Sequence, residues 1–235
     1  MFKNNKTLLT TGLVIASIFA GTFSGSAIAA DEKWKVRFRG IGILPDDSSN
    51  NITLNNTTGL NAGVGVDEAF VPELDITYMI TPHWGVEAIA GIARHDVSIN
   101  GNDATLTGLG IGDGFDIFDT WVLPPTVTLQ YHFLPDNNIR PYVGVGVNYT
   151  ATLFDDATDQ LEAILGPVDV SSSNSWGYAL QAGVDYDINE SWFFNVDVKY
   201  IDINTTAKLG FNGGNLEVDL DINPFVVGAG VGYRF

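Results

Sequence analysis

The last twelve residues, 224–235, alternate between two kinds of side chain and end on an aromatic residue. One parity is apolar from Phe225 to Phe235, and the other carries Val226, three glycines and Arg234. A repeat of two is the period of a β-strand, in which successive side chains point to opposite faces. We therefore expect a strand whose outer face meets lipid and whose end lies at a membrane interface. An edge strand of a soluble sandwich is the alternative.

The same alternation recurs along the chain, with apolar or aromatic residues on one parity and Gly, Thr, Asn, Gln or charged residues on the other. The strands expected from it are 34–39, 70–80, 84–97, 125–133, 141–154, 176–186, 192–201 and 224–235. Short turns at 81–83, 134–140 and 188–191 alternate with long polar loops at 45–66, 98–120, 155–173 and 204–215, and 158–165 has room for a turn or two of helix. The pattern predicts an all-β fold, an eight-stranded antiparallel transmembrane β-barrel with short periplasmic turns and long extracellular loops. A soluble sandwich would more often bury large side chains on its inward face.

The first thirty residues have a different composition from the rest. Lys3 and Lys6 precede an uncharged run over 7–23, and an Ala-Ile-Ala triplet at 27–29 offers a cleavage site. A basic start, an apolar centre and small residues at the exit predict a secretory signal peptide. We expect residues 1–29 to be removed and residues 30–235 to form the barrel.

Charge and cysteine content exclude several classes of function. The formal charge of −17 becomes more negative without Lys3 and Lys6, so nucleic acid is a poor partner. The chain has no cysteine, which excludes disulfides, thiolate nucleophiles and thiolate metal sites. Beyond the signal, no apolar run approaches the length of a spanning helix. If this protein lies in a membrane, it lies there as a barrel.

Charged side chains of the inward parity gather at the turn end of the predicted strands. We expect a periplasmic plug made by Arg37, Arg39, Asp75, Glu87, His132, Asp185, Asp197 and Arg234. Lys35, Gln130 and Asn195 are expected in the same lower part of the lumen. An eight-stranded barrel is only wide enough for its own side chains or one small ligand. Buried charges need partners, so these acids and bases predict a closed lower lumen.

Toward the loop end the inward parity becomes apolar. The residues expected to line this upper lumen are Ile41, Ile43, Ile89, Ala93, Ala179, Ile201, Ile203 and Val226. Gly91, Gly177 and Gly228 are expected to leave room between them. An apolar funnel above a charged floor suits a small hydrophobic molecule better than an ion, although these residues would also lie here if they merely filled space.

A closed floor requires cargo to leave sideways into the bilayer. Proline lacks the backbone donor of a strand ladder. We therefore expect Pro72, Pro124 and Pro125, with Pro224, to mark a possible seam in the barrel wall.

Five blocks in order give the chain its resemblance to a known family. They are LPPT (123–126) with QY (130–131), RPYVGVGVNYT (140–150), SWG (175–177) with GVDY (183–186), DINTTA (202–207) and GYRF (232–235). On these motifs the chain resembles the OmpW family of outer-membrane proteins over nearly all of its mature length. The resemblance implies uptake of small hydrophobic compounds across the bacterial outer membrane, and a terminal strand read by the barrel-assembly machinery. Family members carry an aromatic residue where this chain has Lys199, which implies a more polar lumen here.

Partners and competing functions follow from the same residues. We expect contact with outer-membrane lipid and lipopolysaccharide, a small hydrophobic ligand and a monomeric state. No enzyme activity is predicted, because the three histidines suggest no catalytic arrangement. No metal site or cofactor is predicted, since His95 and Asp96 are too few ligands and the glycine-rich stretch 108–114 has no following lysine. A structural or adhesive protein with an inert lumen is the main alternative, and a barrel enzyme acting on lipid is a third.

Overall fold

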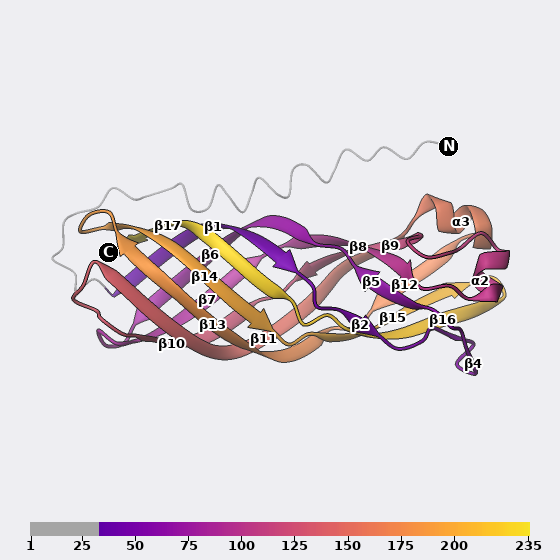
Figure 1. Ribbon diagram of the computed structural model, residues 1–235, viewed down its shortest axis with the longest axis horizontal. Coiled ribbons are helices and arrows are strands. Elements are labelled where there is room, and N and C mark those ends of the chain that lie inside the picture. Colours follow the sequence, from indigo (N-terminus) through magenta and orange to yellow (C-terminus); the bar gives the residue numbers. More distant parts are fainter. Residues whose placement is uncertain (1–32) are drawn as a thin grey trace. The chain divides into compact units, whose positions relative to one another are not determined.

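A computed structural model describes residues 33–235, and the predicted signal peptide lies outside this range (Figure 1). Eight strands form the barrel: β1 (Trp34–Leu44), β6 (Ala69–Met79), β7 (Trp84–Gly91), β10 (Thr126–His132), β11 (Ile139–Ala157), β13 (Ser175–Asp187), β14 (Trp192–Ile201) and β17 (Phe225–Arg234). They run in the order β10-β7-β6-β1-β17-β14-β13-β11, and β10 also pairs with β11. The pairing of β10 with β11 joins the two ends of this order, so the sheet closes on itself, and the first and last strands in sequence, β1 and β17, are neighbours in it. The predicted eight-stranded antiparallel barrel is confirmed.

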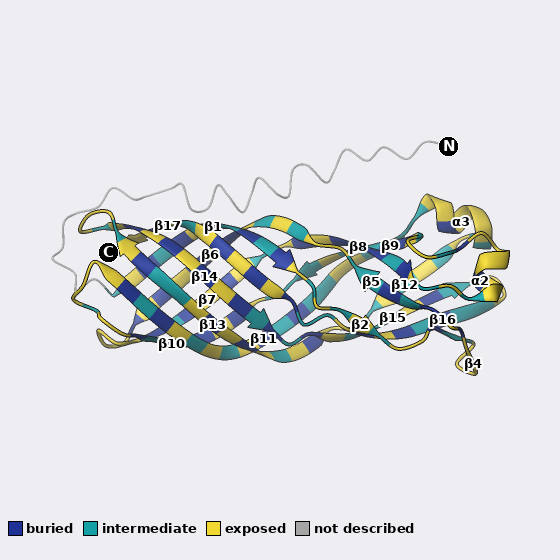
Figure 2. Ribbon diagram, in the orientation of Figure 1, coloured by how far each residue is buried: buried dark blue, intermediate teal, exposed yellow. Residues whose placement is uncertain are grey.

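Burial in the barrel is the reverse of that in a soluble protein. Along β10, Thr128 and Gln130 are fully buried, whereas Val127 and Leu129 are 48% and 42% exposed. Figure 2 shows this alternation as stripes along the barrel strands. A continuous apolar outer face over polar inward residues is the pattern of a barrel whose wall contacts lipid.

Aromatic pairs lie at both ends of the barrel wall. At the ends joined by short turns, Trp34 packs on Tyr78 with ring centroids 4.8 Å apart, and Trp84 packs on Tyr131 at 5.0 Å. At the opposite end, Tyr149 packs on Trp176 at 4.7 Å. Aromatic side chains favour membrane–water interfaces. The two sets therefore mark the edges of the spanning wall.

The four long polar segments are not plain loops, and that expectation was wrong for much of their length. Within or directly beside them lie β2 (Ser48–Ser49), β3 (Thr53–Leu54), β4 (Thr58–Gly59), β5 (Gly63–Val66), β8 (Ala93–Asn100), β9 (Asp116–Leu123), β12 (Val168–Ser172), β15 (Asn204–Phe211) and β16 (Gly214–Asp221). We call these strands, with residues 151–157 of β11, the extension. Residues 93–97 of β8 were expected as strand, as the end of 84–97. The short helices are α2 (Ala104–Gly108) and α3 (Asp159–Leu165), and α3 confirms the helix expected within 158–165. Neither of these helices is long and apolar enough to cross a membrane.

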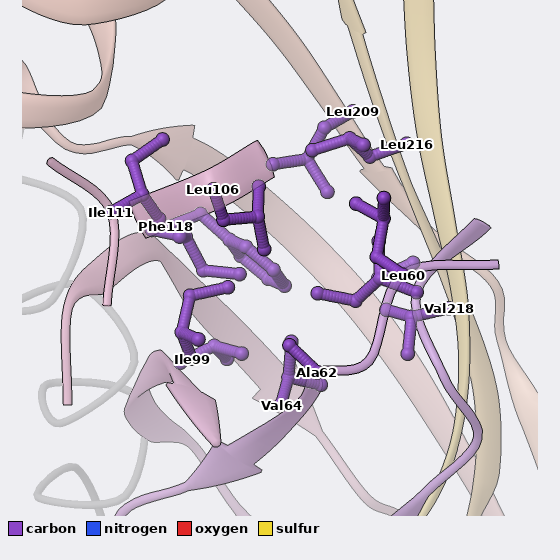
Figure 3. Close-up of a cluster of buried hydrophobic side chains, with 14 of the residues drawn as sticks. Leu60, Ala62, Val64, Ile99, Leu106, Ile111, Phe118, Leu209, Leu216 and Val218 are labelled. Carbon is purple, nitrogen blue, oxygen red and sulfur yellow. The ribbon is translucent and has the colours of Figure 1, made fainter. Parts of the chain in front are cut away.

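The extension has a hydrophobic core of its own, drawn in Figure 3. On β16, Leu216, Val218 and Leu220 are buried on one face, and Leu106 of α2 and Leu161 of α3 belong to the same cluster. Polar residues fill the alternate, solvent-facing positions, which gives these segments the composition of loops. The period of two in these segments, rather than their composition, was the signal that could have identified them as strands.

Candidate functional site

On several barrel strands the lumen changes from charged to apolar within one inward step. On β1 the buried inward residues run from Arg39 to Ile41, and on β14 they run from Lys199 to Ile201. The two steps lie at about one level, because the Glu73 carboxylate contacts both Arg39 and Lys199. They divide the lumen into an ion network near the short turns and an apolar chamber next to the extension.

Arg37 is the centre of the ion network and is completely buried. Its guanidinium donates to Asp75 at 3.0 Å and to Glu87 at 3.2 Å. It also donates to Asp185 at 3.2 Å and to the Thr77 hydroxyl at 2.8 Å. One cation thus compensates three carboxylates that arrive from different strands.

Arg39 is the second hub, one inward step nearer the chamber. Its guanidinium nitrogens lie 2.7 Å from Glu73, 2.9 Å from Asp75 and 2.6 Å from Asp197. Lys199 approaches the same Glu73 carboxylate, with Nζ 2.7 Å and 2.8 Å from its two oxygens. The two arginine hubs are therefore linked through the Asp75 carboxylate.

Strand register explains why these charges meet. Arg37 lies directly opposite Asp75, and Arg39 opposite Glu73, in the antiparallel ladder of β1 and β6. Directly opposed side chains on one face of a ladder are in contact range. Neutral groups complete the network, since Gln181 donates to Asp197 at 2.8 Å. The members of the ion network are Lys35, Arg37, Arg39, Glu73, Asp75, Glu87, Asp185, Asp197 and Lys199.

Two of the expected plug residues lie beside this network rather than within it. These two are Arg234 and His132. Arg234 bonds Asp187 near the short turns, as does Arg140, which was not among the expected plug residues. His132 contacts Gln130, with 3.1 Å between Nε2 and Oε1, and its ring stacks on Tyr142. Arg234 ends β17 and Asp187 ends β13, so both side chains are nearer the barrel rim than the Arg37 hub.

Sequence reasoning missed two buried aromatic residues in this half of the lumen. The Arg37 guanidinium carbon lies 5.4 Å from the ring centroid of Tyr142 and 5.5 Å from that of Phe193. Glycines stand opposite both rings, because a Cβ at Gly183 would lie 2.5 Å from Tyr142 and one at Gly232 would lie 2.2 Å from Phe193. Both aromatics have the inward parity, which was the available signal. The pairing of Glu73 with Lys199 was also missed.

Adding a methyl group at Gly232 tests how tightly this half is packed. Gly232→Ala is expected to lower the free energy of unfolding by about 1–3 kcal/mol, because the buried Phe193 ring must move. The measurement is urea unfolding in detergent micelles, in which the folded fraction is monitored by heat-modifiable migration on a gel. Gly42→Ala is the matched control, since nothing lies within 4 Å of its added Cβ. Equal midpoints for the two variants would contradict this description of the packing.

The apolar chamber has a volume of about 100 Å³. All eight residues expected in the upper lumen are buried. Seven of them line the chamber: Ile41, Ile43, Ile89, Ala93, Ile201, Ile203 and Val226. Ala179 belongs to the same apolar cluster without lining the chamber. The chamber has space for a molecule of a few heavy atoms, or for part of a longer one.

The glycines expected to leave room behave differently from one another. Gly91 lines the chamber. A Cβ at Gly177 would lie 1.8 Å from the Asp202 carbonyl oxygen, and one at Gly228 would lie 2.7 Å from an Asp197 oxygen. At these two positions glycine permits close contact instead of open space, so that part of the expectation was wrong.

The extension covers the chamber. Val97, Phe118 and Leu220 belong to the extension core and also line the chamber. The apolar space therefore lies between a charged floor and a packed apolar roof, whereas the sequence suggested a funnel toward the loops. Any molecule entering from outside must pass through or beside the extension.

The barrel wall is interrupted on both sides of Ile92. The β6–β7 ladder ends at the pair Glu73 and Gly91. On the other side, β7 pairs with β10 as far as Ile89, and pairing resumes only at Ala93 on β8. Ile92 is 44% exposed and also lines the chamber. We call this stretch, residues 90–92 with the strands beside it, the seam.

The three prolines predicted at a seam have different positions relative to it. Pro72 lies next to Glu73, at the point where β6 loses its β7 partner. Pro124 lines the chamber, and its carbonyl accepts from the Thr126 hydroxyl at 3.1 Å. The Pro125 carbonyl instead accepts from the Tyr149 amide at 3.0 Å. Continuing the shared register of β7 with β10 and of β8 with β9 puts residue 124 opposite Gly91 at the seam, whereas the Pro125 carbonyl faces β11.

No group of three or more potential metal ligands occurs within residues 33–235. His95 is buried on the chamber wall, and its Nδ1 lies 2.9 Å from the Asp67 carbonyl oxygen. Its nearest acidic neighbour in sequence, Asp96, pairs with Arg94 at 3.3 Å. These contacts give both residues structural partners.

Comparison with known proteins supports the membrane interpretation of the exposed apolar wall. The family model described as "OmpW family" matches residues 31–235. Outer membrane protein W of Vibrio cholerae is 36% identical over 195 residues, covering 82% of this chain and 84% of that protein. The dibenzothiophene metabolism operon protein PahQ of Pseudomonas aeruginosa is 26% identical and covers 88% of this chain and 90% of its own length.

Among solved structures, the crystal structure of the outer membrane protein OprG from Pseudomonas aeruginosa is similar to this fold. It has a TM-score of 0.78 and 33% sequence identity, and the match covers 87% of this chain and 96% of OprG. The protein is thus an outer-membrane β-barrel, channel-like rather than enzymatic. This chain belongs to the OmpW family.

Proposed function

We propose that this protein takes up small hydrophobic molecules across the outer membrane through the apolar chamber. The observation that supports this proposal most directly is a buried apolar cavity, enclosed in the barrel, directly above a floor of ion pairs. Such a cavity favours apolar ligands because burying their surface removes it from water. The printed name of PahQ, which links that relative to dibenzothiophene metabolism, agrees with a hydrophobic cargo.

The ion network serves as the periplasmic plug in this proposal. Arg37 and Arg39 are both fully buried and each contacts several carboxylates. A hydrophobic molecule that displaced these pairs would leave charges uncompensated at low dielectric, which is strongly unfavourable. Cargo therefore does not continue straight through the lumen.

The seam provides the way out of the chamber. Ile92 contacts both the chamber and the exterior of the wall, and the ladders on its two sides are incomplete. Opening the wall here breaks fewer backbone hydrogen bonds than opening it elsewhere. Pro72 and Pro124 maintain the seam by removing donors from it, and the cargo leaves laterally into the bilayer.

Restoring a backbone donor at the seam is expected to slow uptake. Pro124→Val supplies an N–H toward Gly91, so we expect a several-fold lower initial rate of alkane uptake by cells carrying this variant. Pro125→Val is the matched control, because its new N–H faces Tyr149 on β11. The measurement is uptake of a labelled alkane at equal surface abundance of each protein. A lateral exit at this seam is refuted if both variants transport like the wild type.

The exterior surfaces set the other partners that we propose. The apolar wall contacts membrane lipid. Lipopolysaccharide lies against the extension, the assembly machinery reads the terminal strand β17, and the protein acts as a monomer. The ordered extension with its own core favours one competing function, a structural or adhesive protein. The deciding experiment is uptake by the Ala93→Trp variant, whose indole fills the chamber.

A further inference from the structure

Two charged side chains line the floor of the chamber, whose remaining lining is mostly aliphatic with several serine and threonine residues. Among the chamber-lining residues within 33–235, Glu73 is the acidic one and Lys199 is the only lysine or arginine, and His95 lies higher on the wall. Val226 lies directly beside Lys199 in the β14–β17 register, and Ile201 is the next inward residue on β14. A molecule at this end of the chamber thus meets aliphatic side chains beside the ion pair.

The pair, whose two residues both line the chamber, retains unused hydrogen-bonding capacity. An ammonium group has three donors, and Lys199 uses two on Glu73, at 2.7 Å and 2.8 Å. Its next acidic neighbour, Asp197, lies at 3.7 Å, beyond hydrogen-bond distance. The Glu73 carboxylate has further lone pairs. One donor and one acceptor are therefore available side by side, which matches a hydroxyl group that both accepts and donates.

The charge balance around the pair disfavours an ionised ligand. The lower lumen contains equal numbers of bases and acids, namely Lys35, Arg37, Arg39, Arg140, Lys199 and Arg234 with Glu73, Asp75, Glu87, Asp185, Asp187 and Asp197. An added carboxylate or ammonium would lose its hydration without gaining a net opposite charge. A neutral polar group avoids this cost.

We propose that the cargo is a small apolar molecule with one uncharged hydroxyl group at its end, and that Lys199 and Glu73 bind this group. The inference rests on the proposed uptake function and specifies its substrate class. Lys199 is then a specificity-determining residue. It orients the molecule with its polar end on the floor and its apolar part between Ile41, Ile201 and Val226.

Lys199→Met removes the donor without leaving the Glu73 carboxylate uncompensated. Glu73 keeps Arg39 as a counter-charge, since the two groups lie 2.7 Å apart. Lys208→Met is the matched control, because Lys208 also pairs with a glutamate, Glu217, at 3.1 Å, but on the exposed surface of the extension. Lys199→Gln retains a neutral donor and is expected to preserve most of the preference.

Binding is measured with three probes of equal chain length: octane, 1-octanol and octanoate. The protein is placed in lipid nanodiscs, and the methyl resonances of Ile41 and Ile201 are followed by NMR during titration. We expect 1-octanol to bind wild type and Lys208→Met about tenfold more tightly than either other probe, as one hydrogen bond to a charged group allows. In Lys199→Met this preference should fall to within about threefold.

The outcomes separate the inference from the function on which it rests. Equal binding of octane and 1-octanol by wild type, or a preference that survives in Lys199→Met, overturns the hydroxyl assignment and leaves the uptake function intact. Tightest binding by octanoate overturns the neutral end group. Absence of binding by all three probes overturns the uptake function as well. Heat-modifiable migration of each variant on a gel shows that it has folded.

Discussion

Replacing Arg37 with methionine is expected to lower the free energy of unfolding by about 3–5 kcal/mol or more. This is the range observed when one partner of a buried ion pair is removed and the other stays charged. Arg37 is fully buried and contacts Asp75, Glu87 and Asp185. Its loss leaves three carboxylates sharing fewer cations at low dielectric. The measurement is the urea midpoint of the refolded barrel in lipid vesicles, read by tryptophan fluorescence.

Lys35→Met is the matched control for this change. Lys35 also donates to Asp185, at 3.2 Å, but its loss leaves that carboxylate bonded to Arg37 and Asn195. We therefore expect a much smaller effect. Adding Asp75→Asn to Arg37→Met should recover part of the lost stability, because it removes one uncompensated charge. Equal midpoints for Arg37→Met and Lys35→Met would contradict a central role for Arg37.

Filling the chamber is expected to abolish uptake without preventing folding. Ala93 is buried, lines the chamber and packs in the same apolar cluster as Ile43 and Val226. An indole at this position occupies much of a cavity of about 100 Å³. Cells carrying Ala93→Trp should take up labelled octane at the rate of cells that lack the protein.

Two controls accompany this experiment. Val127→Trp adds the same indole to the lipid face, where Val127 is exposed, and should transport normally. Ala93→Ser keeps the chamber open and should also transport. Wild-type uptake by a folded Ala93→Trp protein would mean that the lumen is inert, and the structural or adhesive function would then be favoured.

Most of the barrel was predictable because its geometry follows from a period of two. Each of the eight wall strands has apolar residues on its outward face. Strand parity alone identified Arg37, Asp75 and Ile201 as inward. Their height along the barrel followed from strand direction. These are local properties of each strand, so they can be read without knowing which strands are neighbours.

Properties that depend on facing walls were harder to predict. The pair of Lys199 and Glu73 joins β14 to β6, two strands that are not adjacent in the sheet. Gly228 was expected to leave space, but Asp197 of the neighbouring strand approaches it closely. Strand parity gives the direction of a side chain, whereas the filling of a narrow lumen depends on the combined volumes of all inward residues.

Most of the extension was missed, for a different reason. Residues 214–221 alternate as clearly as a wall strand, with Leu216, Val218 and Leu220 on one parity. Their alternate positions are polar because they face water instead of lipid. Segments with a wet outer face and an apolar inner face have the average composition of a loop, so only their period reveals them.

The most direct test of the proposed function is a crystal structure of the protein soaked with 1-bromooctane, whose bromine gives an anomalous signal. We predict a bromine peak inside the chamber, between Ile41, Ile201 and Val226 and above the pair of Lys199 and Glu73. Ala93→Trp crystals should lack this peak. Bromine found only on the outer wall or in the extension core, with an empty chamber in the wild type, would contradict uptake through the lumen.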